Sequence, residues 1–192
     1  PKKSAAPRTT LITIDVIAVD DSSPQAVADT IRVAEGGTAT SLLGGASSVI
    51  VNDGGLTDAP VSVSLLIGPS HASSFTLNAD GSFGYTHDGS ENFVDSFTYR
   101  LSDRDGQASE TTVSIDITPV NDHSPIITSN ATPLTAENTV TAVTLSATDA
   151  DLPSQTFDFS IAGGADAACF EIVANELRFT SAPNFERPTD AD

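Results

Sequence analysis

The chain has 192 residues, with 26 acidic against 8 basic side chains and a formal net charge of -18. Such a negative field repels phosphate backbones and anionic membrane surfaces, which makes nucleic acid a poor candidate partner. No apolar run approaches the roughly 18 residues of a membrane helix, so direct membrane insertion is not expected. The single cysteine, Cys169, excludes an intrachain disulfide, and its apolar neighbours predict a buried thiol.

The leading residues of the chain recur 101 residues later. Residues 10–24 read TLITIDVIAVDDSSP, and residues 111–125 read TTVSIDITPVNDHSP. In each copy aliphatic residues alternate with polar ones, as in a strand with one buried face, and an acidic linker closed by proline follows. Self-similarity at this distance predicts tandem structural repeats.

Short alternating runs fill the stretch between the two linkers. SVIV, VSVSLLI, SFTL, GSFGYT and DSFTYRLSD are separated by turn sequences such as NDGG, NADGS and DRDG. With no amphipathic helical window, this spacing predicts an all-β chain of tandem immunoglobulin-like β-sandwich repeats. The predicted core of the complete repeat is formed by Ile31, Val33, Val51, Val63, Leu65, Phe75, Leu77, Phe83, Tyr85, Phe97, Tyr99, Val113, Ile115 and Ile117.

Three segments follow from this pattern. Residues 1–20 are interpreted as the last strand of a preceding repeat or a linker, and residues 21–121 as one complete sandwich. Residues 122–192 form a second repeat that is expected to be incomplete at its C-terminus, since a whole sandwich takes about 100 residues. Its last two strands are expected to be missing. The leading strand of one molecule could therefore add to the open second repeat of another.

Several motifs in order carry a resemblance to a known family. AVADTIRVAEGG, SFTLNADGSFGYTHDGSENFVDSFTYRLSD and TPVNDHSP resemble bacterial cadherin-like repeats of large surface and RTX-type adhesins, and AENTVTAVTLSATDAD with LRFTSAPNFERPTDAD resembles the cadherin domain proper. The resemblance covers almost the whole chain. It implies that the repeats stack end to end, with Ca²⁺ held at each junction by acidic residues of both neighbours and the linker. The chemistry agrees, because Ca²⁺ takes six to eight oxygen ligands.

The resemblance implies a set of ligands at each of three junctions. Between the two repeats the implied ligands are Glu35, Asn121, Asp122, Asp149 and Asp151. At the preceding junction they are Asp20, Asp21, Asp53 and Asp103, with Asn52 and Asp58 as weaker matches. At the following junction they are Glu137, Asn184 and Glu186.

The central junction departs from the family pattern in three respects. Pro119 stands where the family linker begins with aspartate, and His123 replaces its second asparagine. The first repeat has no clear Asp-x-Glu motif, for which Asn92 and Asp95 are loose substitutes. This junction is therefore expected to bind fewer ions or to bind them more weakly. A turn or an Asx cap beside proline is the alternative interpretation of its Asn-Asp pair.

Other kinds of site find little support. His71, His87 and His123 share no ligand spacing typical of zinc and are interpreted as loop residues. There is no Gly-x-Ser-x-Gly elbow, phosphate loop or plausible Cys-His pair. Paired carboxylates of a glycosidase need an aromatic cleft, which 6% aromatics and no Trp can hardly build. The chain is not expected to be an enzyme.

The leading functional hypothesis is a calcium-rigidified spacer and adhesion module within a large cell-surface or secreted protein. Its partners would be the neighbouring repeats of the same protein. Two alternatives remain open: recognition of a cell-surface polysaccharide or partner protein through loops or a sheet edge, and a surface assembly joined by homotypic strand exchange.

Overall fold

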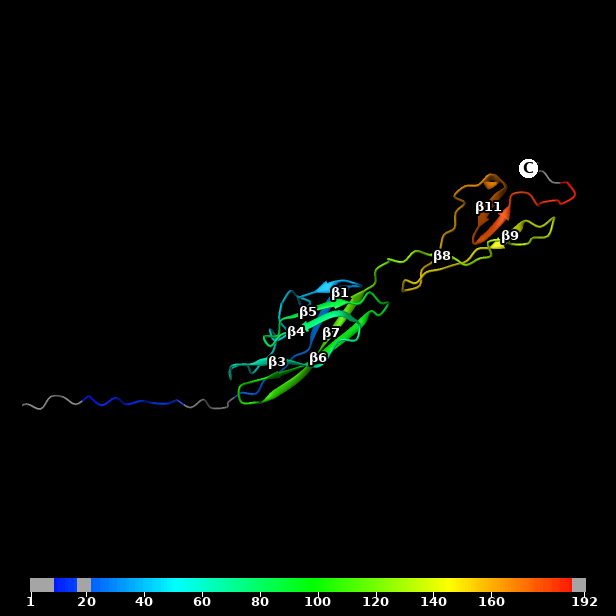
Figure 1. The fold of residues 1–192 in the computed structure, drawn as a ribbon. Helices are drawn as coiled ribbons and strands as arrows, with labels where there is room; N and C mark the ends of the chain where they lie inside the picture. The colour runs from blue at the N-terminus through cyan, green and yellow to red at the C-terminus, as the bar shows by residue number, and fades with distance from the viewer. Residues whose placement is uncertain (1–8, 17–21, 188–192) are drawn as a thin grey trace, which may run out of the picture.

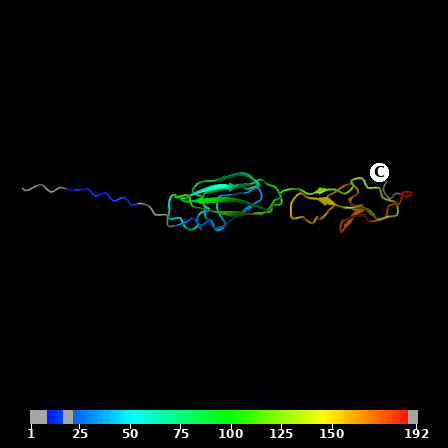
Figure 2. The ribbon, with the colours of Figure 1, turned by 90° about the horizontal axis from the view of Figure 1, so that it is seen from below.

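The computed structural model describes residues 9–16 and 22–187. Two groups of strands follow one another along an elongated molecule, with residues 119–125 crossing between them (Figure 1). The leading segment 9–16 runs away from the first group in extended form, and a view at right angles shows the same order (Figure 2). No helix in the described ranges has the length and apolar character needed to cross a membrane.

The first group of strands is a sandwich of two sheets. The four-stranded sheet has the order β1-β7-β6-β3, formed by β1 (Asp29–Ala34), β7 (Ala108–Thr118), β6 (Val94–Ser102) and β3 (Ser62–Ile67). The three-stranded sheet has the order β2-β5-β4, formed by β2 (Thr38–Ala39), β5 (Phe83–His87) and β4 (Ala72–Leu77). Strand β7 pairs parallel to β1 and antiparallel to β6. The predicted all-β sandwich class is confirmed.

Alternation along the strands places the core. On β7, Val113, Ile115 and Ile117 are buried while their neighbours are not, as the period of two requires. Two of the predicted core residues are exposed instead: Val51 is 66% exposed and Leu65 44%. Val51 lies in a turn rather than a strand, and Leu65 lies beside the register shift of the edge strand β3.

The second group of strands is less closed. Its three-stranded sheet has the order β11-β12-β9, formed by β11 (Phe170–Val173), β12 (Glu176–Phe179) and β9 (Thr141–Thr144). A two-stranded sheet pairs β10 (Ala147–Thr148) with β8 (Ile126–Ile127), and a short 3-10 turn, η1, spans Ala167–Cys169. Within residues 122–187, Asp151 alone is buried. Cys169 is exposed, so the predicted buried thiol is wrong: its short turn is not covered by a second layer.

One carboxyl group is buried in the first sandwich at the start of β1. Asp29 is 8% exposed, and its Oδ2 atom has no hydrogen-bond partner among the described residues. Burial, reinforced by the charge of Asp53, raises the pKa of Asp29 to about 6, although a hydrogen bond with Asn52 opposes the shift. The folded state therefore holds this proton more tightly than the unfolded chain, and ionising Asp29 destabilises the fold.

We expect Asp29→Asn to stabilise the first sandwich at pH 7.5 by about 1–3 kcal/mol and to give little gain near pH 4. The penalty of the wild-type carboxyl is absent below the unfolded pKa of 3.8 and complete above about 6. Urea unfolding in the presence of chelator measures the change in the free energy of unfolding. Tyrosine fluorescence reports on it, because both tyrosines, Tyr85 and Tyr99, lie in this sandwich. An equal gain in the free energy of unfolding at both pH values would contradict the raised pKa of Asp29.

Candidate metal centre between the two repeats

Four ionisable side chains meet where the two groups of strands adjoin. Glu91 comes from the loop between β5 and β6, Asp122 and His123 come from the linker, and Asp151 follows β10. One ligand atom of each lies within 4.8 Å of the others. Three carboxylates and one imidazole, supplied by three separate segments, thus converge on one point.

Asp151 ties the second group of strands to the linker. Its side chain is 1% exposed and accepts the backbone N–H groups of Asp122 at 3.4 Å and His123 at 3.1 Å. Its own N–H donates to Oδ1 of Asp149 at 3.1 Å, in an Asx turn that orients the buried carboxylate. The linker and the loop after β10 therefore hold each other in register.

Glu91 joins the two groups of strands directly. Its Oε2 atom accepts the N–H of Leu152 at 2.9 Å. Its Oε1 atom is buried without a hydrogen-bond partner in the described chain and lies 3.8 Å from Nδ1 of His123. A further hydrogen bond ties the linker to the second group of strands, from Nδ2 of Asn121 to Oε1 of Gln155 at 3.0 Å. Hydrogen bonds therefore connect the first group of strands, the linker and the second group at the junction.

Glu35 lies at the same end of the first sandwich, directly after β1. It is 7% exposed; Oε2 accepts the N–H of Val120 in the linker at 3.1 Å, whereas Oε1 is buried without a partner in the described chain. The turn after it needs a left-handed residue, which Gly36 supplies with a φ of +64°. The N–H of Gly36 donates to Nδ1 of the buried His87 at 3.1 Å, so strand β5 fixes the turn that carries Glu35.

Electrostatics couple His123 to Asp151. Nδ1 of His123 lies 2.7 Å from Oδ1 of Asp151 and 3.0 Å from Oδ1 of Asp122. The hydrogen bond with Asp151, aided by the surrounding carboxylates, raises the pKa of His123. Burial alone would raise the pKa of Asp151, but the hydrogen bonds from His123 and the linker outweigh it and hold that pKa below its ordinary value. The imidazole thus lies at the oxygen that an incoming cation would use.

The donor set fits a hard divalent cation. Carboxylate oxygens are the ligands that Ca²⁺ prefers. The buried Oε1 atoms of Glu35 and Glu91 have no hydrogen-bond donor in the described chain, and a cation would take the place of that donor. A buried acceptor without a partner costs about 1–3 kcal/mol, so both atoms favour a bound positive charge. The imidazole of His123 is the one member that does not suit Ca²⁺.

The structure brings together part of the predicted ligand set and adds to it. Asp122 and Asp151 lie in the four-residue cluster; Glu35, Asn121 and Asp149 contact the linker or the loop of Asp151.

Sequence reasoning missed Glu91 and misread His87. Asp95, a loose substitute for the Asp-x-Glu motif, instead accepts the N–H groups of Ser70 and His71 at 2.9 Å. Glu91 takes the place at the junction, in an Asp-x-x-Glu stretch one residue longer than the motif. His87 is a buried strand residue, which corrects its reading as a loop residue, and His123 is a member of the cluster.

The far end of the second group of strands repeats the arrangement around Glu35. Oε2 of Glu137 accepts the N–H of Phe185 at 3.2 Å, and Oδ1 of Asn184 accepts the N–H of Glu186 at 3.0 Å. Asn138 has a φ of +62°, the conformation that Gly36 has after Glu35. The three residues implied for the following junction therefore lie in two loops that are hydrogen-bonded to each other.

Among the described residues, the acids implied for the preceding junction each have their own hydrogen-bond partners. Asp20 and Asp21 lie outside the described residues. Asp53 accepts the N–H of Val27 at 2.7 Å and the hydroxyl of Tyr99 at 2.9 Å. Asp103 accepts N–H groups within its own turn through Oδ1, at 3.1 and 2.8 Å, and keeps a buried Oδ2 without a partner in the described chain. The weaker matches also have contacts in the fold. Asp58 accepts the N–H of Ser22, and the side chain of Asn52 donates a hydrogen bond to Asp29.

Known proteins share both the sequence pattern and the fold. The family model of the bacterial cadherin-like domain matches residues 21–119. A crystal structure of human CDH23 EC21-23 is 26% identical, with a TM-score of 0.61 over 90% of this chain and 58% of that one. Mouse Cadherin-23 EC22-24 is also 26% identical, with a TM-score of 0.58 over 86% of this chain and 56% of that one. The chain thus spans a little over half the length of these structures. The human Desmocollin-1 ectodomain, 18% identical over 88% of this chain and 34% of its own, shares the fold with a TM-score of 0.58.

Proposed function

Because this chain belongs to the family of bacterial cadherin-like domains, we propose that it is a calcium-binding spacer and adhesion module of a large cell-surface or secreted protein, such as an RTX-type adhesin. The observation that carries the proposal is the convergence of Glu91, Asp122 and Asp151 from two repeats and their linker. With it we propose the division into a leading segment, 1–20, a complete repeat, 21–121, and a second repeat, 122–192.

The residues of the junction explain why a cation would stiffen it. The three carboxylates repel one another, and the chain as a whole carries a charge of -18, so little nearby charge offsets them. A bound Ca²⁺ supplies positive charge and a shared coordination shell. Glu91 then anchors the first repeat, Asp151 anchors the second, and Asp122 with the Glu35 contact to Val120 fixes the linker between them.

A stiff junction suits a spacer. The two repeats follow one another end to end (Figure 2). A junction that cannot bend therefore makes them parts of one extended rod, whereas a flexible junction would act as a hinge. The matched structures include an ectodomain and cadherin repeats, which supports an extracellular or cell-surface location for this chain. Neighbouring repeats of the same protein are the partners that this geometry requires.

We expect Ca²⁺ to bind with measurable heat in calorimetry and to reduce the range of particle shapes in small-angle scattering, reversibly with chelator. Glu91→Gln keeps the size of the side chain but removes one junction charge, and it should weaken Ca²⁺ binding about tenfold or more, equivalent to ~1.4 kcal/mol. Glu171→Gln, an exposed change on β11 away from the cluster, is the matched control and should bind as the wild type does.

The proposal fails if the wild-type chain binds no Ca²⁺ at millimolar concentration and its scattering is identical in Ca²⁺ and chelator. A Glu171→Gln effect as large as that of Glu91→Gln would also count against this site, because the loss would then follow net charge and not position.

His123→Asn restores the asparagine of the family linker and should strengthen Ca²⁺ binding roughly three- to tenfold. The reason is that the imidazole Nδ1, 2.7 Å from Oδ1 of Asp151, no longer competes for that oxygen. Calorimetric titration measures the gain, with His71→Asn in the first repeat as the control. Weaker binding by His123→Asn would show that the imidazole organises the site instead of competing with the ion.

A further inference from the structure

The outer face of the sheet β1-β7-β6-β3, turned away from the core of the first repeat, carries an ordered pattern of side chains. Along β7, Val113, Ile115 and Ile117 are buried, so the residues between them point outward. Pairing of β7 with β6 and with β1 then brings outward side chains of neighbouring strands together. Three contacts lie on the outer face: Thr98 with Thr112 at 3.0 Å, Arg100 with Glu110 at 3.8 Å, and Arg32 with Asp116 at 3.9 Å.

The outer face is electrically balanced within a strongly acidic repeat. Residues 22–118 contain twelve acidic and three basic residues. The outer face holds two of each, Arg32 and Arg100 against Glu110 and Asp116, so its net charge is zero. The rest of the repeat holds the other ten acidic residues and one basic residue. Two copies of the chain therefore repel each other least where their outer faces meet.

Short side chains keep the outer face flat. Thr30 of β1 pairs with Ser114 of β7, and Ser114 pairs with Ser96 of β6, so a row of hydroxyl groups crosses three strands. Ile67 and Val94, which pair with outward residues of the neighbouring strands, are 65% and 73% exposed. A flat sheet face with some exposed apolar surface suits the packing of one sheet on another.

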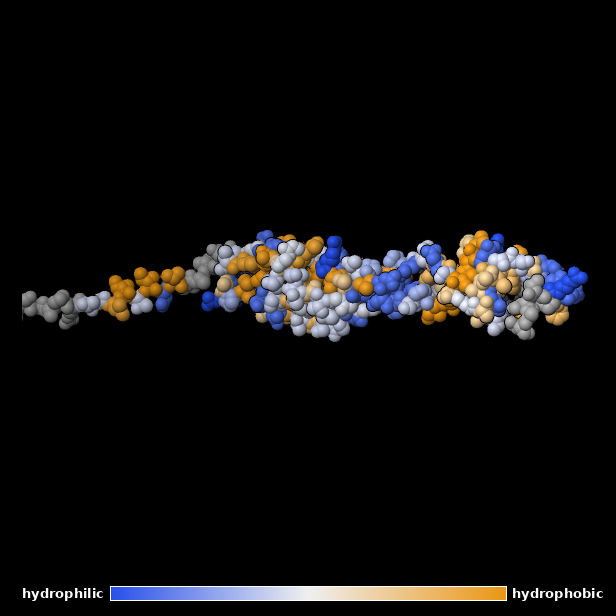
Figure 3. Space-filling model, turned by 90° about the horizontal axis from the view of Figure 1, so that it is seen from above, coloured by the Kyte–Doolittle hydropathy of each residue, from blue (hydrophilic) through white to orange (hydrophobic). Residues whose placement is uncertain are grey.

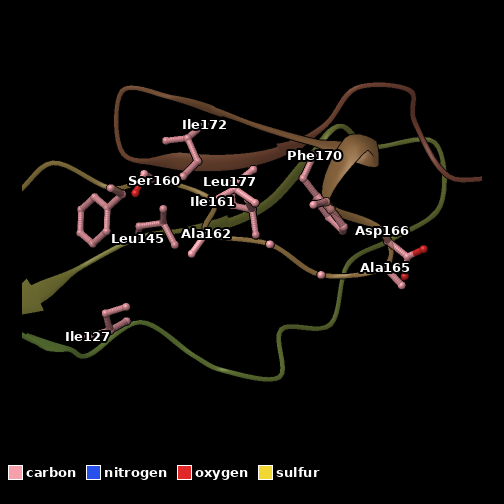
Figure 4. A pocket seen from close by; sticks show the side chains of 14 residues that line it. Ile127, Leu145, Ser160, Ile161, Ala162, Ala165, Asp166, Phe170, Ile172 and Leu177 are labelled. Carbon is pink, nitrogen blue, oxygen red and sulfur yellow. The ribbon is translucent and has the colours of Figure 1, made fainter.

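The sides of the first repeat differ in character from the junction. In the view of Figure 3, strongly hydrophilic side chains gather between the two repeats, whereas paler ones cover much of the first repeat. Among the described residues, a sheet of four strands occurs only in the first repeat. In the second repeat, Ile127, Leu145 and Ile172 line a groove between the strands (Figure 4). The outer face is thus a feature of the first repeat.

We propose that the outer face binds the outer face of a second copy of this chain, with a twofold axis that runs along the strands between β6 and β7. Such an axis places β6 of each copy over β7 of the other. Arg100 of each copy then lies opposite Glu110 of the other, and Thr98 lies opposite Thr112. A twofold axis across the strands at the middle of the face is disfavoured, because it brings Glu110 of one copy near Asp116 of the other and the two carboxylates repel.

The ion pair within one copy leaves both side chains able to bind a second partner. Arg100 and Glu110 are 46% and 54% exposed, and the distance of 3.8 Å between their charged atoms exceeds that of a hydrogen bond. A guanidinium carries five N–H donors, so Arg100 can hold one carboxylate in its own copy and another across the contact. The pattern of charge is therefore complementary to itself.

The size of the outer face sets the expected affinity. Four strands about 4.8 Å apart, with about 3.4 Å per residue between Ala108 and Asp116 of β7, give an area of about 500 Å² per copy. A total of about 1,000 Å² is typical of weak contacts, and we expect a dissociation constant of about 50–500 μM. Because the axis runs along the strands, the two copies point in the same direction. The contact is therefore a lateral association of parallel rods.

Sedimentation equilibrium of the 192-residue chain between 10 μM and 1 mM tests the proposal, in reducing buffer so that Cys169 forms no disulfide. We expect a monomer–dimer equilibrium that agrees within threefold in Ca²⁺ and in chelator, since no residue of the junction cluster lies on the outer face. This result is independent of Ca²⁺ binding at the junction. Arg100→Glu and Glu110→Arg should each weaken dimerisation at least tenfold, because each places like charges opposite one another.

An equimolar mixture of the two variants provides the decisive measurement. Opposite charges face each other again in the mixed dimer, so its dissociation constant should lie within threefold of that of the wild type. Arg104→Glu makes the same change of charge as Arg100→Glu in the turn after β6, away from the outer face, and should leave dimerisation within twofold of the wild type.

Three outcomes would overturn the proposal. They are a monomeric mass of the wild type at every concentration, equal losses from Arg100→Glu and Arg104→Glu, and a mixture of the two variants that stays monomeric. Circular dichroism of each variant accompanies the measurement. Both substituted positions are exposed, so each variant should keep the spectrum of the wild type.

Discussion

Repulsion between carboxylates at the boundary of two repeats is the constraint on which the relation of one repeat to the next depends. Asp151 is almost fully buried, yet it lies in one cluster with Glu91 and Asp122. In a partly buried site such charges interact far more strongly than in water, so the cluster needs a compensating cation or proton. The imidazole of His123 provides part of that compensation, and a metal ion with several ligand positions would provide more.

The first sandwich prepares the junction before the second repeat contributes to it. Glu35 N–H donates to the carbonyl of Thr118 at the end of β7, so the parallel pairing of β1 and β7 extends up to the linker. His87, at the end of β5, holds the turn after Glu35. Both sheets of the sandwich therefore position a single glutamate, and the second repeat then docks on this rigid edge through Glu91 and Leu152.

Alternation in the sequence predicted the strands well, because a strand with one buried face imposes a period of two on its residues. It failed at Val51, which lies in a turn, and at Leu65, where the edge strand shifts register. Burial of Cys169 was wrong because local apolar neighbours do not reveal whether a second layer covers them. Asp122 and Asp151 were found from motif order, whereas Glu91 and His123 required the fold, since an extra residue in a loop or a lone histidine has no spacing to recognise.

Four acidic side chains in the described part of the chain illustrate three physical states, and the state indicates which of them suit a cation. Asp95 accepts three backbone N–H groups and a tyrosine hydroxyl; burial alone would raise its pKa, but these hydrogen bonds outweigh it and hold the pKa low, so its charge is already satisfied. Asp29 has one side-chain hydrogen bond, with Asn52, which does not offset its burial, and a proton stabilises it instead. Glu35 and Glu91 each use one oxygen for a backbone N–H at the junction and keep the other buried without a donor. Because these free oxygens lie beside the linker that both repeats share, a cation bound there would act on the angle between repeats and not merely on the stability of either one.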